Sequence, residues 1–317
     1  MTPSPPDWVP SGAWLAPGYA EWAPPAALRA MVACLWARVT PEDADQADQA
    51  DRAETAAPAA RSGLVLPDAC SDLIWERGAG AYIAGPDSGP ARPMLKAGTV
   101  MVGIRFRPSA GGQLLRVPLS EILNQRVPLA DLLPSAAGRL PPTLGPEEAV
   151  HRVLGLTGGL VVDGAPDPAM ARAAVLLRDP AARAEAVAAE VGLSERQFRR
   201  RSQAAAGYSP KTLQRVLRFH RFVRLLDAAS PPPDLAALAA EGGYADQAHL
   251  TRECSAFSGF TPANLATVRC TRQEDTRQED ARQQDPRQQD ASQEDTGQSP
   301  GGSAIMAVPI SRKPSRA

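Results

Sequence analysis

The 317-residue chain has few of the residues that build metal centres or disulfide frameworks. It contains only three histidines, and none of them lies in the stretch 62–133. Its four cysteines are Cys34, Cys70, Cys254 and Cys270, and they show neither CxxC nor Cys/His spacing. This scatter argues against a zinc site, and we interpret the cysteines as small buried hydrophobic residues. We therefore expect no metal and no cofactor.

The chain also lacks the segments that mark membrane or secreted proteins. No apolar run reaches the ~18 residues of a membrane span. The first residues, MTPSPPDWVP, have neither the basic block nor the apolar block of a signal peptide. Phosphate-loop, nucleophile-elbow and HExxH motifs are missing too. These absences predict a cytoplasmic protein that is not an enzyme and has no membrane partner.

What the chain does contain is an internal repeat of two helix-turn-helix patterns, Ala182–Gly207 and Asp234–Gly259. Each pattern has an apolar helix, a glycine turn and a second helix. In the first pattern, Gly192 stands where the turn requires a positive φ. Ser194 and Gln197 then form a capping-box pair at the start of the second helix.

The segment Ser209–Ala229 between the two patterns predicts one long amphipathic helix. Ser209 and Pro210 are typical of a helix start. One face is apolar, with Leu213, Val216, Phe219, Val223 and Leu226. The opposite face carries Arg218, Arg221 and Arg224. A helix of about twenty residues is ~30 Å long, close to the ~34 Å between successive major-groove faces of B-DNA.

These stretches resemble the DNA-binding domain of the AraC/XylS family of bacterial transcription regulators. The resemblance covers roughly Pro168–Val268 and rests on LSERQFRRR, YSPK and GYADQAHLTRE, on both turn glycines, and on the spacing between them. It implies a seven-helix domain whose third and sixth helices enter the major groove of double-stranded DNA. It also implies sequence-specific regulation of transcription, with two units in adjacent grooves.

The resemblance assigns six DNA-contacting positions. On the first recognition helix they are Arg196, Arg199 and Arg200, and on the second they are Gln247, His249 and Arg252. Arginine suits guanine or phosphate, and glutamine suits adenine or phosphate. The surrounding stretch 194–225 holds nine Lys and Arg residues against Glu195 alone. Such local positive charge is expected of a phosphate-binding surface, although the whole chain has a net charge of −1.

Three positions depart from the family pattern. Ser202 and Cys254 stand where the family usually has large apolar residues, which predicts underpacking of ~1–3 kcal/mol at each. Phe257 could fill part of the second gap. Ala245 replaces the usual small polar cap of the second recognition helix, a loss of ~1 kcal/mol.

The stretch 62–133 predicts a β-rich region, with a barrel as one form it could take. Short apolar segments bounded by glycine and proline indicate strands around Leu73–Trp75, in AYIAGP and in GTVMVGIRFRP. The motifs in Leu66–Ile74, Gly85–Pro86 and Gly103–Pro108 resemble the amino-terminal domain of a subgroup of AraC-type regulators. By that resemblance the domain senses a ligand or dimerises.

The nearest approach to a catalytic site in this region is Asp68 and Asp72 with Cys70 between them. We interpret Asp68, which follows Pro67, as a turn or cap residue rather than a catalyst. Arg105 and Arg107 alternate on a predicted strand. They could meet an anionic ligand or pair with Asp68 or Asp72, and the sequence favours the pairing.

The predicted fold class is α+β, with a β-rich amino-terminal domain followed by an all-α double helix-turn-helix domain. We expect a β-rich sensor or dimerisation domain at 1–140, which contains a flexible acidic insert at 41–61. A linker follows at 141–166, with a short helix near Pro146–Leu156. The DNA-binding domain occupies 167–268, and a disordered tail occupies 269–317. The tail repeats TRQED-like pentapeptides, whose composition cannot bury a core.

Two other functions stay open at this point. One is an enzyme with an appended AraC-like domain, as in alkylation-responsive proteins. Such proteins need a cluster of zinc-binding cysteines, and the cysteines of this chain lack that spacing. The other is a scaffold that binds a protein through the helical domain, which the arginine-rich face disfavours. Besides DNA, RNA polymerase, a small-molecule effector and a second copy of the chain are the partners that the resemblance leaves open.

Overall fold

The structure is a computed structural model, and it describes residues 18–40, 64–93, 95–164, 167–229 and 234–269. The described residues fall within one compact unit. The predicted acidic insert at 41–61 and the pentapeptide tail lie outside the described residues, apart from Arg269. None of the described helices is both long enough and apolar enough to span a bilayer.

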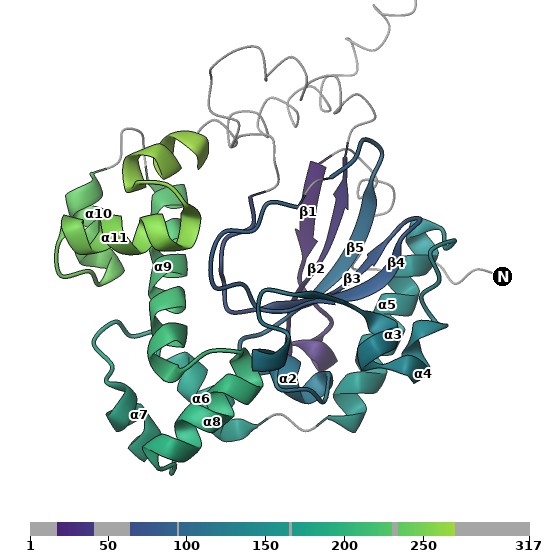
Figure 1. Cartoon of the computed structure of the whole chain (residues 1–317), viewed down its shortest axis with the longest axis horizontal. Helices are drawn as coiled ribbons and strands as arrows, with labels where there is room; N and C mark the ends of the chain where they lie inside the picture. Colours follow the sequence, from purple (N-terminus) through teal and green to yellow (C-terminus); the bar gives the residue numbers. More distant parts are fainter. Residues whose placement is uncertain (1–17, 41–63, 94, 165–166, 230–233, 270–317) are drawn as a thin grey trace, which may run out of the picture. The chain divides into compact units, whose positions relative to one another are not determined.

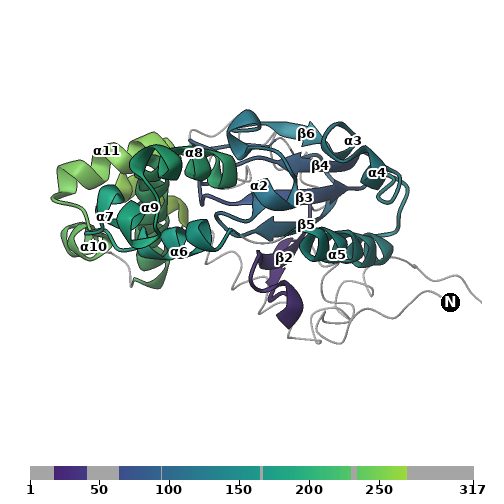
Figure 2. The same ribbon diagram turned by 90° about the horizontal axis from the view of Figure 1, so that it is seen from below.

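The amino-terminal region is built on one antiparallel sheet of six strands. The strands are β1 (Gly18–Trp22), β2 (Val32–Val39), β3 (Ser71–Glu76), β4 (Gly80–Ala84), β5 (Val100–Phe106) and β6 (Arg126–Pro128). Their order across the sheet is β1-β2-β5-β3-β4-β6, and Figure 2 shows the strands from β2 to β6 in this order. Among the described strands β1 and β6 are not paired with each other, so the sheet is open. The barrel form that the sequence allowed is therefore wrong.

Alternation along the strands gives the sheet two different faces. One face packs into the main core, to which β5 contributes Val102, Ile104 and Phe106. The other face is covered by a smaller cluster that includes Trp36, Ile74 and Met101. Polar residues that alternate with the main core, such as Asp72 and Arg105, therefore share the face of the smaller cluster.

A long helix, α5 (Pro146–Asp163), completes the main core. Its residues Ala149, Val150, Val153 and Leu156 are buried with the sheet residues. The sequence indicated only a short helix near Pro146–Leu156 inside a linker, so this helix is longer than expected and is a core element. Val161, near its end, also packs against that core.

Short elements fill the ends of the sheet. They are η2 (Ala26–Leu28), α2 (Gly111–Leu114), η3 (Leu119–Glu121), α3 (Leu129–Leu132) and α4 (Pro134–Ala137). The stretch 26–40 begins in the short helix η2 and continues in β2. The edge strand β6 was not expected, since only three residues form it and the last of them is Pro128.

The carboxyl-terminal region is helical. It contains α6 (Pro168–Leu176), α7 (Ala184–Glu190), α8 (Glu195–Ala206), α9 (Pro210–Ala228), α10 (Leu235–Gly242) and α11 (Gln247–Ser258), followed by a helical segment at 262–269 (Figure 1). These helices share one apolar core that includes Phe198, Phe219, Phe222 and Leu265. The α+β class and the seven-helix layout are confirmed.

Local capping chemistry sets where these helices begin. Asp167 accepts hydrogen bonds from two amide groups at the start of α6. Ser194 and Gln197 form the predicted capping box of α8, and Ser209 accepts from the amide of Thr212 in α9. The turn glycine Gly192 has a φ of 71°, which confirms its predicted role.

The second recognition helix, α11, is capped one residue later than the sequence suggested. Asp246 is its N-cap, and its carboxylate accepts a hydrogen bond of 2.6 Å from the amide of His249. Ala245 lies outside the helix, so the predicted loss of a cap at this position is wrong. The start of α11 therefore has a side-chain cap, as the starts of α6 and α9 do.

We expect Asp246→Ala to lower the free energy of unfolding by about 1 kcal/mol, because the amide of His249 would lose its acceptor. Ala245→Ser is the matched control and should change stability by no more than a few tenths of a kcal/mol. Denaturant titration of the two variants measures the difference. If Ala245→Ser raises the free energy of unfolding by more than Asp246→Ala lowers it, the N-cap of α11 is at position 245 instead.

Candidate nucleic-acid interface

The first recognition helix, α8, buries one side and exposes the other. Phe198 is 1% exposed and lies in the helical core. Arg196, Arg199 and Arg200 are exposed, and none forms an ion pair with any described residue. Buried Phe198 fixes the rotation of the helix, so the three guanidinium groups are presented to solvent.

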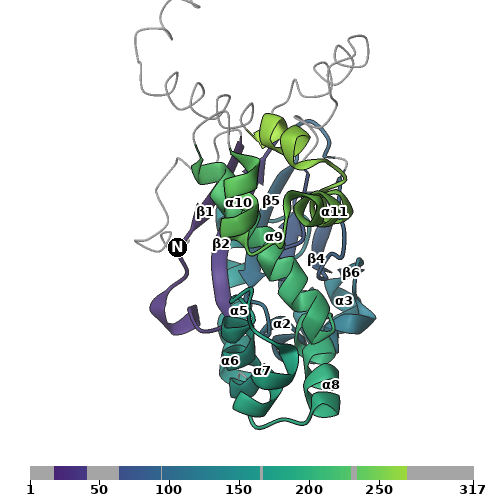
Figure 3. The ribbon, with the colours of Figure 1, turned by 90° about the vertical axis from the view of Figure 1, so that its left-hand side faces the viewer.

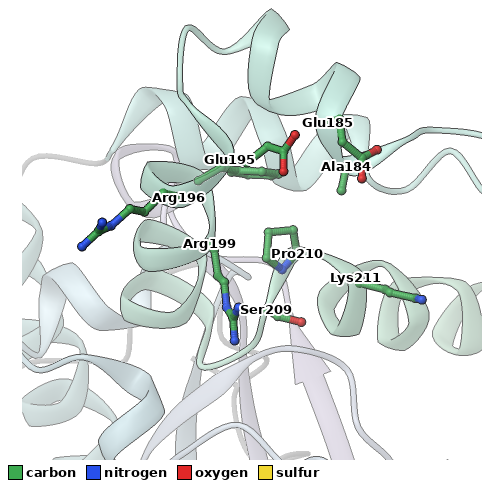
Figure 4. Close-up of a pocket in the computed structure, with 9 residues that line it drawn as sticks. Ala184, Glu185, Glu195, Arg196, Arg199, Ser209, Pro210 and Lys211 are labelled. Carbon is green, nitrogen blue, oxygen red and sulfur yellow. The ribbon is translucent and has the colours of Figure 1, made fainter.

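An open cleft of about 590 Å³ lies beside Arg196 and Arg199 (Figure 4). Its walls come from the starts of α7, α8 and α9. The basic residues that line it are Arg196, Arg199 and Lys211, and the acidic ones are Glu185 and Glu195. Lys211 is exposed at the first turn of α9, so a second helix adds its charge to those of α8. The cleft has a positive wall that can meet phosphate groups.

The three positions predicted on α11 are placed differently from one another. Gln247 and Arg252 are exposed, and Arg252 forms no ion pair with any described residue. The His249 ring instead packs edge-on against Tyr244, with 5.2 Å between the ring centres. Its Nε2 lies 3.7 Å from Glu253, and the side chain is 29% exposed. His249 therefore orders the second unit, whereas Gln247 and Arg252 are free to reach outward.

A buried carboxylate joins α11 to the linker helix. Glu253 accepts a hydrogen bond of 2.7 Å from Nε of Arg215 and bonds of 3.1 Å from Nη2 of Arg218. Its side chain is only 6% exposed. Each guanidinium also lies 5.2 Å from the centre of an aromatic ring, Arg215 at Phe257 and Arg218 at Tyr244. The sequence reveals Glu253 only as the last residue of GYADQAHLTRE, with no sign of its partners.

This cluster reduces the positive surface that the sequence predicted. Arg215 and Arg218 are engaged by Glu253, and Arg201 lies 3.0 Å from Asp167. These three arginines hold the helices together, and the carboxylates of Glu253 and Asp167 offset two of their three charges. The basic residues of 194–225 that form no ion pair with any described residue are Arg196, Arg199, Arg200, Lys211, Arg221 and Arg224.

The linker helix α9 separates the two recognition helices. Figure 3 shows α8 near one end of α9, and α10 and α11 near the other. The predicted apolar stripe is confirmed, since Leu213, Val216, Phe219, Val223 and Leu226 are all buried. With 19 residues, α9 is about 28 Å long at ~1.5 Å per residue. That length is comparable to one turn of B-DNA, ~34 Å.

The two small residues in the helical core have local partners. The Ser202 hydroxyl donates a hydrogen bond of 2.8 Å to the carbonyl of Tyr208, across the turn between α8 and α9. Cys254 lies 3.6 Å from the Ser258 hydroxyl, and Phe257 packs on Phe219 with ring centres 5.3 Å apart. The Ser202 hydroxyl is thus satisfied, and Phe257 packs in the core beside Cys254, as the sequence suggested.

Two family models match the chain. Residues 187–267 match the family described as a helix-turn-helix domain, and residues 20–128 match a domain of unknown function, DUF6597. No curated protein matches the chain.

Three solved structures of ToxT from Vibrio cholerae are similar in fold. One is 12% identical, covers 65% of this chain and 92% of its own, and has a TM-score of 0.37. A second is 10% identical, covers 65% and 93%, and has a TM-score of 0.38. A third, with bound unsaturated fatty acid, is 12% identical, covers 65% and 90%, and has a TM-score of 0.37. At these identities the likeness concerns the fold alone.

The helical region is therefore a DNA-binding module of the helix-turn-helix class, and both units and the connecting helix are present in it. The helix-turn-helix domain at 187–267 is of the AraC type. The resemblance seen in the sequence is confirmed.

Proposed function

We propose that the protein binds a specific double-stranded DNA sequence with α8 and α11 in successive major grooves on one face of the duplex. Arg196, Arg199 and Arg200 contact the first groove, and Gln247 and Arg252 contact the second. Lys211 binds backbone phosphate beside the first groove. His249 was predicted as a contact as well, and in this proposal its first role is to position α11 through Tyr244 and Glu253.

The observation that carries the proposal is the rigid link between the units. Arg215 and Arg218 of α9 bind Glu253 of α11, and α9 and α8 share one core. The exposed arginines of α8 are thereby held at a fixed distance from Arg252. Two recognition helices can dock at the same time only if they are held at a fixed spacing close to one turn of B-DNA.

The proposal includes modulation by the amino-terminal region, because that region contacts the turn between α8 and α9. The Tyr208 hydroxyl donates a hydrogen bond to the carbonyl of Asp87. Ala69 has a φ of 65° and is buried in the helical core. Burial lowers the pKa of His220 in α9, and the charge of Asp68 opposes that shift. The loops around Asp68 and Asp87 can therefore bias the position of α8 and α9.

Arg200→Ala and Lys211→Ala test which contacts read sequence. We expect Arg200→Ala to cost about 1–3 kcal/mol of binding to the preferred site and much less on random DNA, because a bidentate guanine contact is lost. Lys211→Ala should weaken binding to the preferred and the random DNA by the same factor. It should also reduce the slope of log affinity against log salt concentration by about 1. The measurement is a salt titration of both variants on a site selected from random DNA.

Arg172→Ala is a control, since Arg172 is an exposed residue of α6 that pairs with Glu190. It should leave both affinities unchanged. Equal losses for Arg200→Ala on preferred and random DNA would place Arg200 on a phosphate. Failure of the wild-type chain to select any sequence would overturn sequence-specific binding. RNA polymerase and a second copy of the chain stay predicted partners that this experiment does not address.

A further inference from the structure

One loop of the amino-terminal region reaches both helix-turn-helix units. It follows β4 at residues 85–93, with the sequence GPDSGPARP. Pro86 lies against Gly207, because a Cβ atom on Gly207 would come within 2.9 Å of the Pro86 ring. Pro90 lies beside Gly259, with 3.8 Å between the corresponding Cβ position and the proline ring. The two prolines of this short loop therefore contact different units.

The two glycines hold equivalent places in the repeat. Each is the residue that ends a recognition helix, Gly207 after α8 and Gly259 after α11. Both are in the left-handed region, with φ values of 83° and 77°. Glycine adopts this conformation without strain, and at Gly207 the lack of a Cβ atom also leaves room for Pro86. The loop thus touches the same point of both recognition helices.

A second contact of a different kind accompanies each proline. At the first unit, the Tyr208 hydroxyl donates a hydrogen bond to the carbonyl of Asp87. At the second unit, the Arg92 guanidinium lies 5.2 Å from the centre of the Phe260 ring, which is a cation-π distance. Tyr208 and Phe260 each follow directly after one of the two glycines. The equivalence of the two contact points therefore extends to the next residue.

The middle of the loop is anchored to the amino-terminal region. The Asp87 carboxylate accepts hydrogen bonds of 3.1 and 2.7 Å from Arg126 of β6. The side-chain carbonyl of Asn124 accepts a bond of 2.7 Å from the amide of Ser88. The Asn124 side chain also donates a bond of 2.9 Å to the Ser88 hydroxyl. These anchors lie between the two prolines, so the loop is fixed between the points at which it meets the two units.

We propose that loop 85–92 is a brace that holds the two units at a fixed relative position, and that Pro86 and Pro90 are positioning residues for DNA binding. The linker helix α9 joins the units inside the helical region, and the loop joins them a second time through the amino-terminal region. Two connections restrict relative rotation more than one does, which lowers the cost of ordering both units on DNA. This effect on DNA rests on the proposed two-groove docking, whereas the bracing itself does not.

Asn124→Gly in the full chain tests the brace without DNA. Asn124 has a φ of 60°, which glycine adopts freely, so the substitution removes the bonds to Ser88 without straining the backbone. We expect amide hydrogen exchange to rise at least about threefold in both 203–209 and 255–261, the turns that end α8 and α11, and to stay unchanged in α5. Asn124→Asp is the matched control, because its carboxylate still accepts from Ser88 and aspartate tolerates this φ. It should exchange as the wild type does.

Arg126→Gln removes the bonds to the Asp87 carboxylate and should give the same exchange pattern, so it serves as the test if Asn124→Gly does not fold. A rise at both turns with α5 unchanged supports the brace. A rise at only one turn, at neither turn, or to the same extent in α5 overturns it.

The consequence for DNA is measured on sites whose two half-sites have either the selected spacing or one additional base pair between them. The wild type should prefer the selected spacing at least about tenfold, and Asn124→Gly should lose about threefold or more of that preference. An unchanged preference in folded Asn124→Gly would also overturn the proposal. A wild type without any spacing preference would contradict the proposed function instead, and the exchange pattern would then decide on the brace by itself.

Discussion

Glu253→Gln should lower the free energy of unfolding by about 2–4 kcal/mol, because it leaves two arginines beside a neutral amide in a mostly buried site. Arg218 has 14% of its side chain exposed and Arg215 has 38%, so water can offset part of the loss. We therefore expect a loss of free energy of unfolding at the lower end of the range that is usual when one partner of a buried ion pair is removed. Urea titration followed by circular dichroism measures it.

The same substitution should weaken DNA binding in a recognisable way. Without Glu253, α11 loses its charged link to α9, while α8 keeps its own capping box and core. We expect loss of protection at the second half-site and retention at the first. Glu190→Gln is the control, since its pair with Arg172 is exposed on both sides and should contribute no more than about 1 kcal/mol. Equal destabilisation by the two variants would show that Glu253 is not a structural link.

Insertion of one alanine after Arg218 should abolish simultaneous docking of the two units. The insertion rotates everything that follows by ~100° and moves it ~1.5 Å along the helix axis. Leu213 and Val216 would stay in phase with the first unit, whereas Phe219, Val223 and Leu226 would leave the buried stripe. The gain in affinity from having two linked contacts, which can exceed tenfold, should then disappear.

Arg224→Ala is the matched control for the insertion. Arg224 is exposed on the same helix and forms no ion pair with any described residue, so its removal alters charge without altering the phase of α9. It should reduce affinity slightly and evenly at both half-sites. Circular dichroism of the insertion variant shows whether the helical domain still folds, which separates loss of spacing from loss of structure.

The parts of the fold that depend on near neighbours in sequence could be predicted. Ser194 and Gln197 are three residues apart, and their capping box is confirmed. The stripe on α9 follows helical periodicity and is confirmed as well. The α8 positions Arg196, Arg199 and Arg200 are exposed as expected, although their contacts with DNA stay a prediction.

Features that depend on distant residues could not be predicted. Glu253 meets Arg215 and Arg218 across 38 and 35 residues, and no local pattern indicates that these two arginines share one carboxylate. Whether a sheet closes depends on pairing between its first and last strands, which alternation does not reveal. Arg105 was correctly paired with Asp68 and Asp72, but Arg107 binds the carbonyl of Arg29 instead.

The most direct test of two linked recognition helices is a hydroxyl-radical footprint on the selected DNA site, with wild type and the alanine insertion compared at the same salt. We predict two protected patches for the wild type, one turn of DNA or ~34 Å apart on one face of the duplex. The folded insertion variant should protect only the patch bound by α8. Protection of both patches at wild-type affinity by the insertion variant would contradict the fixed spacing that α9 and Glu253 provide.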